Sequence, residues 1–183
     1  MSVKRIGLFA LTAALTLSAA PTMAKTLVAS LSDGRALTLA VPEDWQSSQE
    51  AAGPALTIRL SSGDSASFVV LLTVLPITPG SPASTPDGLK VLAIEQGNQA
   101  LKTALQERLE LTEIKGQQAI GYVYHVTDRK PEKGPRDYRE ADQGIVLLGR
   151  HVVAVTILTH PNDSATVELA KQMIAGAQIS SDH

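Results

Sequence analysis

Short apolar runs that flank tight polar turns recur along this sequence, and they constrain the fold more than any other feature. Two of the turns, Asp33-Gly34 and Gly149-Arg150, have the residue types that connect neighbouring antiparallel strands. The sequence therefore predicts a largely antiparallel sheet built from hairpins. Four pairs of runs follow this pattern, at residues 26–31 with 36–41, 56–60 with 66–75, 109–113 with 119–126, and 138–148 with 151–158.

In two segments the apolar residues recur at the spacing of a helix rather than that of a strand. The first begins at Thr85, a good N-cap followed by Pro86 and Asp87, which suit the first turn of a helix. Gly97 lies on the apolar stripe of this helix, so we expect the helix to approach the sheet closely there. The second follows residues 160–163, where Asn162 or Asp163 can cap it. Its apolar stripe is Val167, Ala170, Ile174 and Ala177, and that of the first helix is Leu89, Leu92, Ala93, Gly97, Ala100, Leu101 and Ala104.

The order of these elements predicts an α+β fold, in which a largely antiparallel sheet of about six to eight strands is covered by two main helices. The segment 68–75 is nearly all apolar and rich in valine. We therefore expect it at the centre of the sheet, buried on both faces. The pattern leaves open whether the two helices share one face of the sheet.

The first 24 residues resemble a secretory signal peptide. Lys4 and Arg5 precede the apolar run 6–20, and small residues at 22 and 24 suit a cleavage site after Ala24. Cleavage after Ala20 and retention as a membrane anchor are alternatives, although the run is short for a span. We expect one domain at 25–183, in the periplasm or secreted, with no membrane span after cleavage.

Charge and cysteine content exclude several classes of protein. Without Lys4 and Arg5, the chain has 14 basic residues against 18 acidic ones, which argues against a nucleic-acid partner. The absence of cysteine excludes disulfides, thiolate catalysis and cysteine-bound metals. We expect no cofactor, and the chain is compatible with a monomer.

Three segments resemble the PsbP-like superfamily of exported proteins, and within it the bacterial DcrB-like group. They are an early strand that ends in the Val-Pro-Glu-Asp-Trp element at 41–45, the middle helix followed by a strand and the turn at 113–119, and the final hairpin and helix at 144–180. The resemblance implies an α/β sandwich, and it implies binding or assembly rather than catalysis. One branch of the superfamily serves the oxygen-evolving side of photosystem II, and another binds a small GTPase. We therefore expect a non-enzymatic binding or assembly protein of the bacterial envelope, with an envelope protein as partner.

Two neighbouring regions are candidates for ligand or partner contact. Tyr122, Tyr124 and His125, with Arg129 close by, could form one wall of a ligand groove. Alternatively, the two tyrosines pack beneath a helix. The charged loop 128–139 is long and is placed opposite the proline-rich loop 76–86, which makes it the preferred contact region. Its candidate residues are Arg129, Lys130, Lys133, Arg136, Tyr138 and Arg139.

Catalytic and metal-binding patterns in the sequence are incomplete. A Gly-Asp-Ser segment at 63–65 is similar to the nucleophile block of one esterase class, but no histidine stands in the required arrangement. His125 with Asp128 and His160 with Asp163 are only pairs, whereas metal sites usually need three or four ligands. We assign no catalytic or metal residue. A small periplasmic hydrolase or ligand-binding enzyme with a pocket near Tyr124 and His125, and a structural subunit of an envelope complex, are the alternatives.

Overall fold

The computed structural model describes residues 24–63, 67–131 and 133–180. Apart from Ala24, the expected signal peptide lies outside these residues. Asp64 and Ser65 of the Gly-Asp-Ser segment also lie outside them.

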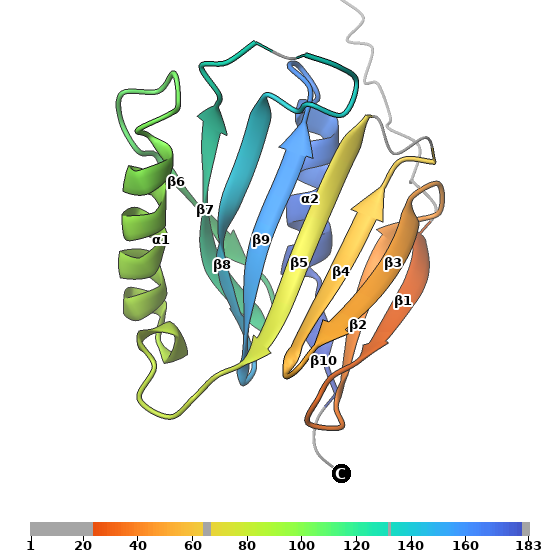
Figure 1. Cartoon of the computed structure of the whole chain (residues 1–183). Coiled ribbons are helices and arrows are strands. Elements are labelled where there is room, and N and C mark those ends of the chain that lie inside the picture. Colours follow the sequence, from red (N-terminus) through yellow and green to blue (C-terminus); the bar gives the residue numbers. More distant parts are fainter. Residues whose placement is uncertain (1–23, 64–66, 132, 181–183) are drawn as a thin grey trace, which may run out of the picture.

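The strands form two antiparallel sheets. The larger sheet has seven strands in the order β3-β4-β5-β9-β8-β7-β6, and the smaller has three in the order β1-β2-β10 (Figure 1). The strands of the larger sheet are β3 (Gln46–Ala52), β4 (Ala55–Ser61), β5 (Phe68–Pro76), β6 (Leu111–Lys115), β7 (Ala119–Thr127), β8 (Glu140–Leu148) and β9 (His151–Thr159). Those of the smaller sheet are β1 (Ala24–Ser30), β2 (Ala36–Pro42) and β10 (Gln178–Ile179).

The four predicted hairpins are confirmed, but the predicted number of strands is too small. The described residues contain ten strands rather than six to eight. The two additional strands are β3 and β10, and neither carries a strand signal in the sequence. All seven residues of β3 are exposed, so it has no apolar alternation, and β10 is only two residues long.

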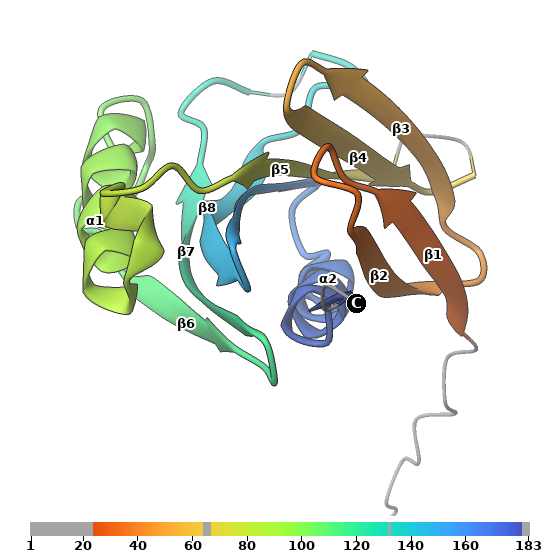
Figure 2. The ribbon, with the colours of Figure 1, turned by 90° about the horizontal axis from the view of Figure 1, so that it is seen from below.

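The two helices lie on opposite faces of the larger sheet. Helix α1 (Pro86–Ala100) packs against β7 and β8 from outside, and α2 (Ser164–Ala175) lies on the inner face, beside the smaller sheet (Figure 2). Both predicted caps are confirmed, because Thr85 accepts a hydrogen bond from the Gly88 N–H and Asp163 from the Thr166 N–H. The short 3-10 helix η1 (Pro82–Ser84) precedes α1. None of the helices in the described parts of the chain is both long and apolar enough to span a membrane.

Strand β5 is less central and less covered than its composition predicts. It is third in the order of the larger sheet, and only its first three residues are consecutively buried. Leu71, Thr73 and Leu75 are half-buried, because they lie on the outer face and α1 covers β7 and β8 instead. The inner-face residues, including Val70 and Leu72, belong to the main core between the two sheets and α2.

Gly97 permits a close approach, but not to the sheet. A Cβ at this position would lie 2.3 Å from a methyl group of Leu109, in the connection between α1 and β6. The chain after α1 folds back against the helix, so the contact is with that connection. Ala104, which the predicted stripe included, lies beyond the end of α1 and is buried in the same connection.

The two long loops lie at opposite ends of the larger sheet. Loop 76–86 leaves the end at which Pro76 pairs with His151, whereas loop 128–139 joins β7 to β8 at the end at which Glu140 pairs with Thr159 (Figure 1). They do not face each other across a shared surface. The two loops are separated by the length of the sheet, which is about 30 Å for nine-residue strands. A partner that contacts both loops would have to cover this whole length.

Candidate functional site

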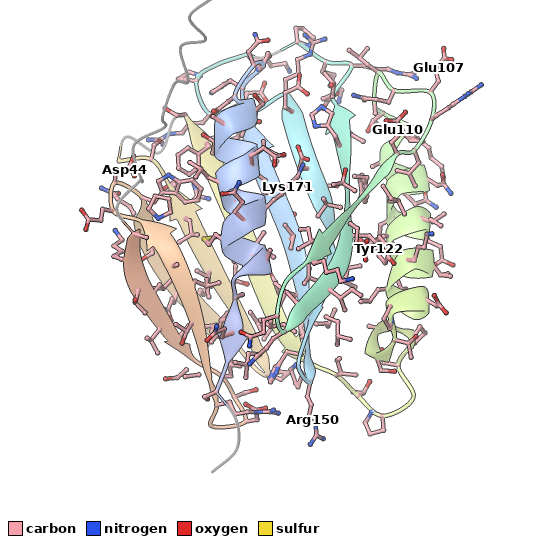
Figure 3. The ribbon with its side chains drawn as sticks, turned by 180° about the vertical axis from the view of Figure 1, so that it is seen from behind. Asp44, Glu107, Glu110, Tyr122, Arg150 and Lys171 are labelled. Atoms are coloured by element: carbon pink, nitrogen blue, oxygen red, sulfur yellow. The ribbon has the colours of Figure 1, made fainter. Side chains whose placement is uncertain are left out.

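A cleft of about 410 Å³ opens at the end of the sheet that carries loop 128–139. The ends of β7, β8 and β9 form one side of it, and the turn at 160–163 and the first half of α2 form the other. Figure 3 shows Lys171 on the helix that covers this part of the sheet. The polar residues that line it include His125, Glu140, Asp142, Thr159, His160 and Lys171.

Asp142 is the buried centre of this site. Its side chain is 4% exposed, and its Oδ2 lies 2.9 Å from Nδ1 of His125 while its Oδ1 lies 2.9 Å from Nζ of Lys171. The register of β7 and β8 places His125 directly opposite Asp142. Because side chains alternate along a strand, Asp142 shares the inner face with Val146 and Leu148 of the main core. Helix α2 then brings Lys171 onto the same carboxylate.

His125 lies between two carboxylates. Its Nδ1 faces Asp142, and its Nε2 lies 2.9 Å from Oε2 of Glu140. A carboxylate only accepts hydrogen bonds, so both contacts are hydrogen bonds only when both ring nitrogens carry protons. The hydrogen bond to Asp142, followed by the charges of Asp142 and Glu140, raises the pKa of His125 against the opposing effect of burial. The site therefore favours the imidazolium form of a side chain that is 48% exposed.

A hydrogen-bonded chain extends the site towards the end of α1. Glu140 accepts a hydrogen bond from the Thr127 hydroxyl at 2.7 Å, and that hydroxyl accepts one from Nε2 of Gln106 at 2.9 Å. The Gln106 Oε1 in turn accepts a hydrogen bond from the backbone N–H of Thr127 at 2.8 Å. Thr127 is the last residue of β7, so this chain fixes the strand end next to His125.

The charges around Asp142 hold it in the ionised form. Burial is the largest single influence and raises its pKa, but the hydrogen bonds from His125 and Lys171 together lower the pKa below its ordinary value. Lys171 also lies 3.6 Å from Glu168, one helical turn away and mostly exposed. Asp142, His125 and Lys171 thus form a buried anion between two cations.

His125 also lines a second hollow, of about 470 Å³. This hollow is lined by the residues that connect α1 to β6, among them Glu107, Arg108 and Glu110. Figure 3 shows Glu107 and Glu110 near this end of the molecule and Arg150 at the opposite end. The half-exposed imidazole of His125 therefore borders both the cleft and this hollow.

The two tyrosines of the predicted groove lie on the other face of the sheet from His125. Tyr124 is 3% exposed, packs with Ala104 and Val126, and donates a hydrogen bond to Oε1 of Gln143 at 3.2 Å. Its burial raises its pKa. Tyr122 packs beside α1, with Nζ of Lys90 5.9 Å from its ring centre. Because side chains alternate between the two faces along β7, both tyrosine rings lie on the face away from the cleft.

Two of the three arginines of loop 128–139 fold back onto the protein backbone. Nε of Arg129 donates to the Ala104 carbonyl at 2.6 Å, and Nε of Arg139 donates to the Asp128 carbonyl at 3.1 Å. Arg136 is exposed. These bonds support the base of the loop and leave its tip in solvent.

The rest of the loop contacts the wall of the cleft. The Tyr138 ring lies 5.1 Å from that of His160, and His160 Nε2 lies 3.2 Å from the Pro135 carbonyl. The backbone N–H groups of Lys130 and Lys133 donate to the side chains of Asp128 and Asp137 respectively. Both lysines are exposed. The loop and the cleft are thus neighbours that share His160.

Three residues of the site, Glu140, Asp142 and Lys171, were not predicted from the sequence. The signal for Asp142 is present, because an acidic residue two places before Gly144 is in phase with the inner-face residues Val146 and Leu148. Lys171 follows Ala170 on the buried stripe of α2. A charged residue on an apolar face implies a partner, although only the fold supplies that partner.

The chemistry of the site is that of hydrogen-bond donors and ion pairs. Within the described residues, no three His, Asp or Glu side chains are placed to hold a metal ion. Asp128 and His125 do not converge, since Asp128 lies in the loop beyond the end of β7. When both ring nitrogens of His125 carry protons, the imidazolium has no free lone pair with which to accept a further proton, and a paired ammonium is a poor nucleophile.

Comparison with known proteins supplies no family for this chain. No family model and no curated protein match it. A solved structure from Bacteroides thetaiotaomicron VPI-5482 is similar over 80% of this chain and 46% of the other, with 12% sequence identity and a TM-score of 0.49. This chain thus spans about half the length of that protein.

Proposed function

We propose that this protein is a non-enzymatic binding or assembly protein of the bacterial envelope, and that it binds its partner at the cleft beside His125. In this proposal residues 1–24 are a signal peptide that directs export to the periplasm. The domain at 25–183 then acts there as an α/β sandwich of the PsbP-like kind, similar to the DcrB-like group.

The observation that carries the binding role is the pairing of the charged groups at the bottom of the cleft. Asp142 is held by Lys171 and His125, and His125 is held by Glu140, each at 2.9 Å. General base catalysis needs a side chain that can accept a proton at the operating pH, and these contacts disfavour that state of His125. The same groups, rigidly held at a cleft, can donate and accept hydrogen bonds to a polar partner.

Loop 128–139 supports a contact surface larger than the cleft alone. It is charged, it is anchored at its base by Arg129 and Arg139, and it reaches the cleft through His160. A partner that inserts a polar group beside His125 would also meet the exposed lysines of this loop. A single surface at one end of the sheet is therefore the proposed interface.

The second candidate is a small hydrolase or ligand-binding enzyme that uses His125. The two hollows that His125 lines favour this alternative, because a small ligand could approach the imidazole. In this role the imidazolium would act as a proton donor rather than a base. Hydrolysis that is lost in His125→Gln, while the variant stays folded, would favour the enzyme over the binding protein.

Site-specific photo-crosslinking in intact cells tests the proposed interface. A photoreactive residue at Asn162 or Glu168 lies on the exposed rim of the cleft, and one at Thr78 lies in the loop at the far end of the sheet. We expect the two rim positions to capture one envelope component and Thr78 to capture none. Mass spectrometry of the adducts would identify that component.

Thr78, at the far end of the sheet, is the control position for the two rim positions. Equal capture from Thr78 would indicate non-specific contact and would contradict an interface at the cleft. No adduct from either rim position under any growth condition would contradict the binding role itself. Recovery of the protein in the cytoplasmic fraction with residues 1–24 intact would contradict export.

A further inference from the structure

His151 is a buried histidine at the end of the sheet opposite the cleft. It is the first residue of β9, directly after the Gly149-Arg150 turn, and it is 1% exposed. It shares the inner face of β9 with Val153 and Val155 of the main core. The candidate site does not use it, and an ionisable side chain this deeply buried needs a physical explanation.

The turn between β1 and β2 covers His151. Nε2 of His151 lies 3.2 Å from Oδ2 of Asp33, but neither ring nitrogen makes an aligned hydrogen bond with any described residue. Asp33 is already held by Arg35, whose Nε and Nη2 donate to the same carboxylate oxygen at 2.9 and 2.6 Å. This contact joins the smaller sheet to the larger one at the end of the core.

A proton added to His151 would leave one of its two N–H donors without an acceptor in the described parts of the chain. The imidazolium form has two N–H donors, and the one at Nδ1 would be buried without an acceptor among the described residues. The charged groups that act on the ring are Asp33 and Arg35 from the β1–β2 turn and the exposed Arg150 from its own hairpin. The strand residues that pair with His151, Pro76 and Leu148, are uncharged.

The electrostatic surroundings agree with this geometry. Burial is the largest influence and lowers the pKa of His151, and the charges of Arg35 and Arg150 lower it as well. The charge of Asp33 and its contact with the ring raise the pKa, but the net result lies below the ordinary value. His151 is therefore neutral in the folded protein at pH 7. Because the pKa is lower in the closed fold than in a water-exposed ring, acid favours states in which the ring has access to water.

We propose that His151 is an acid-sensitive latch, which keeps the β1–β2 hairpin docked on the larger sheet while it is neutral and releases the hairpin when it is protonated. Release gives both ring nitrogens access to water and separates the ring from Arg35. It also uncovers the inner face of β2, where Leu37 and Leu39 are each 1% exposed in the closed fold. Acid thus converts a buried apolar strand face into an exposed one.

Amide hydrogen exchange of the whole protein between pH 7.5 and pH 5 tests the latch. Below pH about 6.5, the opening equilibrium of β1 and β2 should rise by up to about tenfold per pH unit, after correction for the intrinsic exchange rate. Amides of β4 and β5 in the same sample serve as the internal reference and should change far less. Equal protection of β1 and β2 at both pH values would overturn the proposal.

Two histidine variants separate the latch from general acid effects. His151→Leu replaces the imidazole with an apolar side chain of similar size and removes the group that binds the proton. The acid response of β1 and β2 should therefore disappear. His125→Gln changes the other end of the sheet and should retain that response. An acid response that persists in His151→Leu would overturn the proposal.

A direct titration covers the case in which His151→Leu does not fold. The His151 ring carbon signals of the wild-type protein should report a pKa below 6.5, and the exchange of β1 and β2 should increase over the same pH range. A His151 titration at or above 6.5 would contradict the latch.

Discussion

The two ends of the larger sheet each place a histidine beside an aspartate, and they shift the pKa values of these histidines in opposite directions. At the cleft, His125 is 48% exposed and lies 2.9 Å from both Asp142 and Glu140. At the other end, His151 is 1% exposed and lies 3.2 Å from Asp33. The pKa of His125 is raised, mainly by its hydrogen bond to Asp142, and that of His151 is lowered, mainly by burial.

The number of available acceptors explains the difference better than the distances do. His125 has one carboxylate for each ring nitrogen, so its cation is fully paired. His151 has only Asp33, which two donors of Arg35 already occupy. A histidine beside a carboxylate is therefore not necessarily charged, because burial and competing cations can outweigh one acceptor.

These opposite shifts give opposite dependences of stability on pH. A raised pKa in the fold means that the contribution of His125 is present below pH about 6.5 and is lost as the pH rises through its folded pKa. A lowered pKa means that the contribution of His151 is present above pH about 6.5 and is lost as the pH falls towards its folded pKa. The two ends limit stability from the alkaline and the acid side respectively.

The largest expected effect is that of Asp142→Asn. It leaves Lys171 and His125 without their shared anion, and the free energy of unfolding should fall by about 2–4 kcal/mol at pH 7. Chemical denaturation measures this loss. Glu95→Gln on the exposed side of α1 is the matched control and should change stability by less than about 0.5 kcal/mol. A loss as small as that of the control would show that Asp142 does not organise the cleft.

Asp33→Asn should have a smaller effect on stability, because the Asp33 side chain is 29% exposed. We expect a loss of about 1 kcal/mol from the broken ion pair with Arg35. The pKa of His151 should fall further, since the charge of Asp33 raises it. Denaturation and a ring-proton titration of His151 measure the two effects, with Asp44→Asn as an exposed control. A rise in the pKa of His151 would reverse our account of this end of the sheet.

The smallest expected effect is that of His125→Gln, and it should depend on pH. Because His125 is half-exposed, its ion pairs should contribute less than about 1 kcal/mol at pH 6, and this contribution should shrink towards pH 9. Urea denaturation of wild type and variant at both pH values measures the difference. A larger loss at pH 9 than at pH 6 would contradict a raised pKa for His125.

Local patterns predict most of the secondary structure of this protein. The β8–β9 hairpin follows from two apolar runs around Gly149, whose φ of 60° suits glycine in a tight turn. Thr85 and Asp163 were predicted as helix caps because their side chains can accept backbone N–H groups nearby in sequence. Strand β3 could not be predicted, because its residues are polar and exposed and only its pairing with β4 defines it.

The candidate site is less predictable than the fold, because it is made by contacts between distant segments. His125 was singled out from the sequence together with Tyr124, but alternation along β7 places the two on opposite faces. Asp142 could be placed on the inner face from its phase with Val146. Its partner Lys171 comes from α2, and nothing local to either residue predicts their contact.

The sequence by itself determined the antiparallel hairpins and the two capped helices, because each depends on residues within one turn or one strand pair. Only the tertiary structure decided that α1 and α2 lie on opposite faces of the sheet, and that the two long loops lie at opposite ends. It also decided which of the two histidines has a raised pKa and which has a lowered one. That choice depends on burial and on the charges that other segments bring within a few ångströms, and no local pattern contains them.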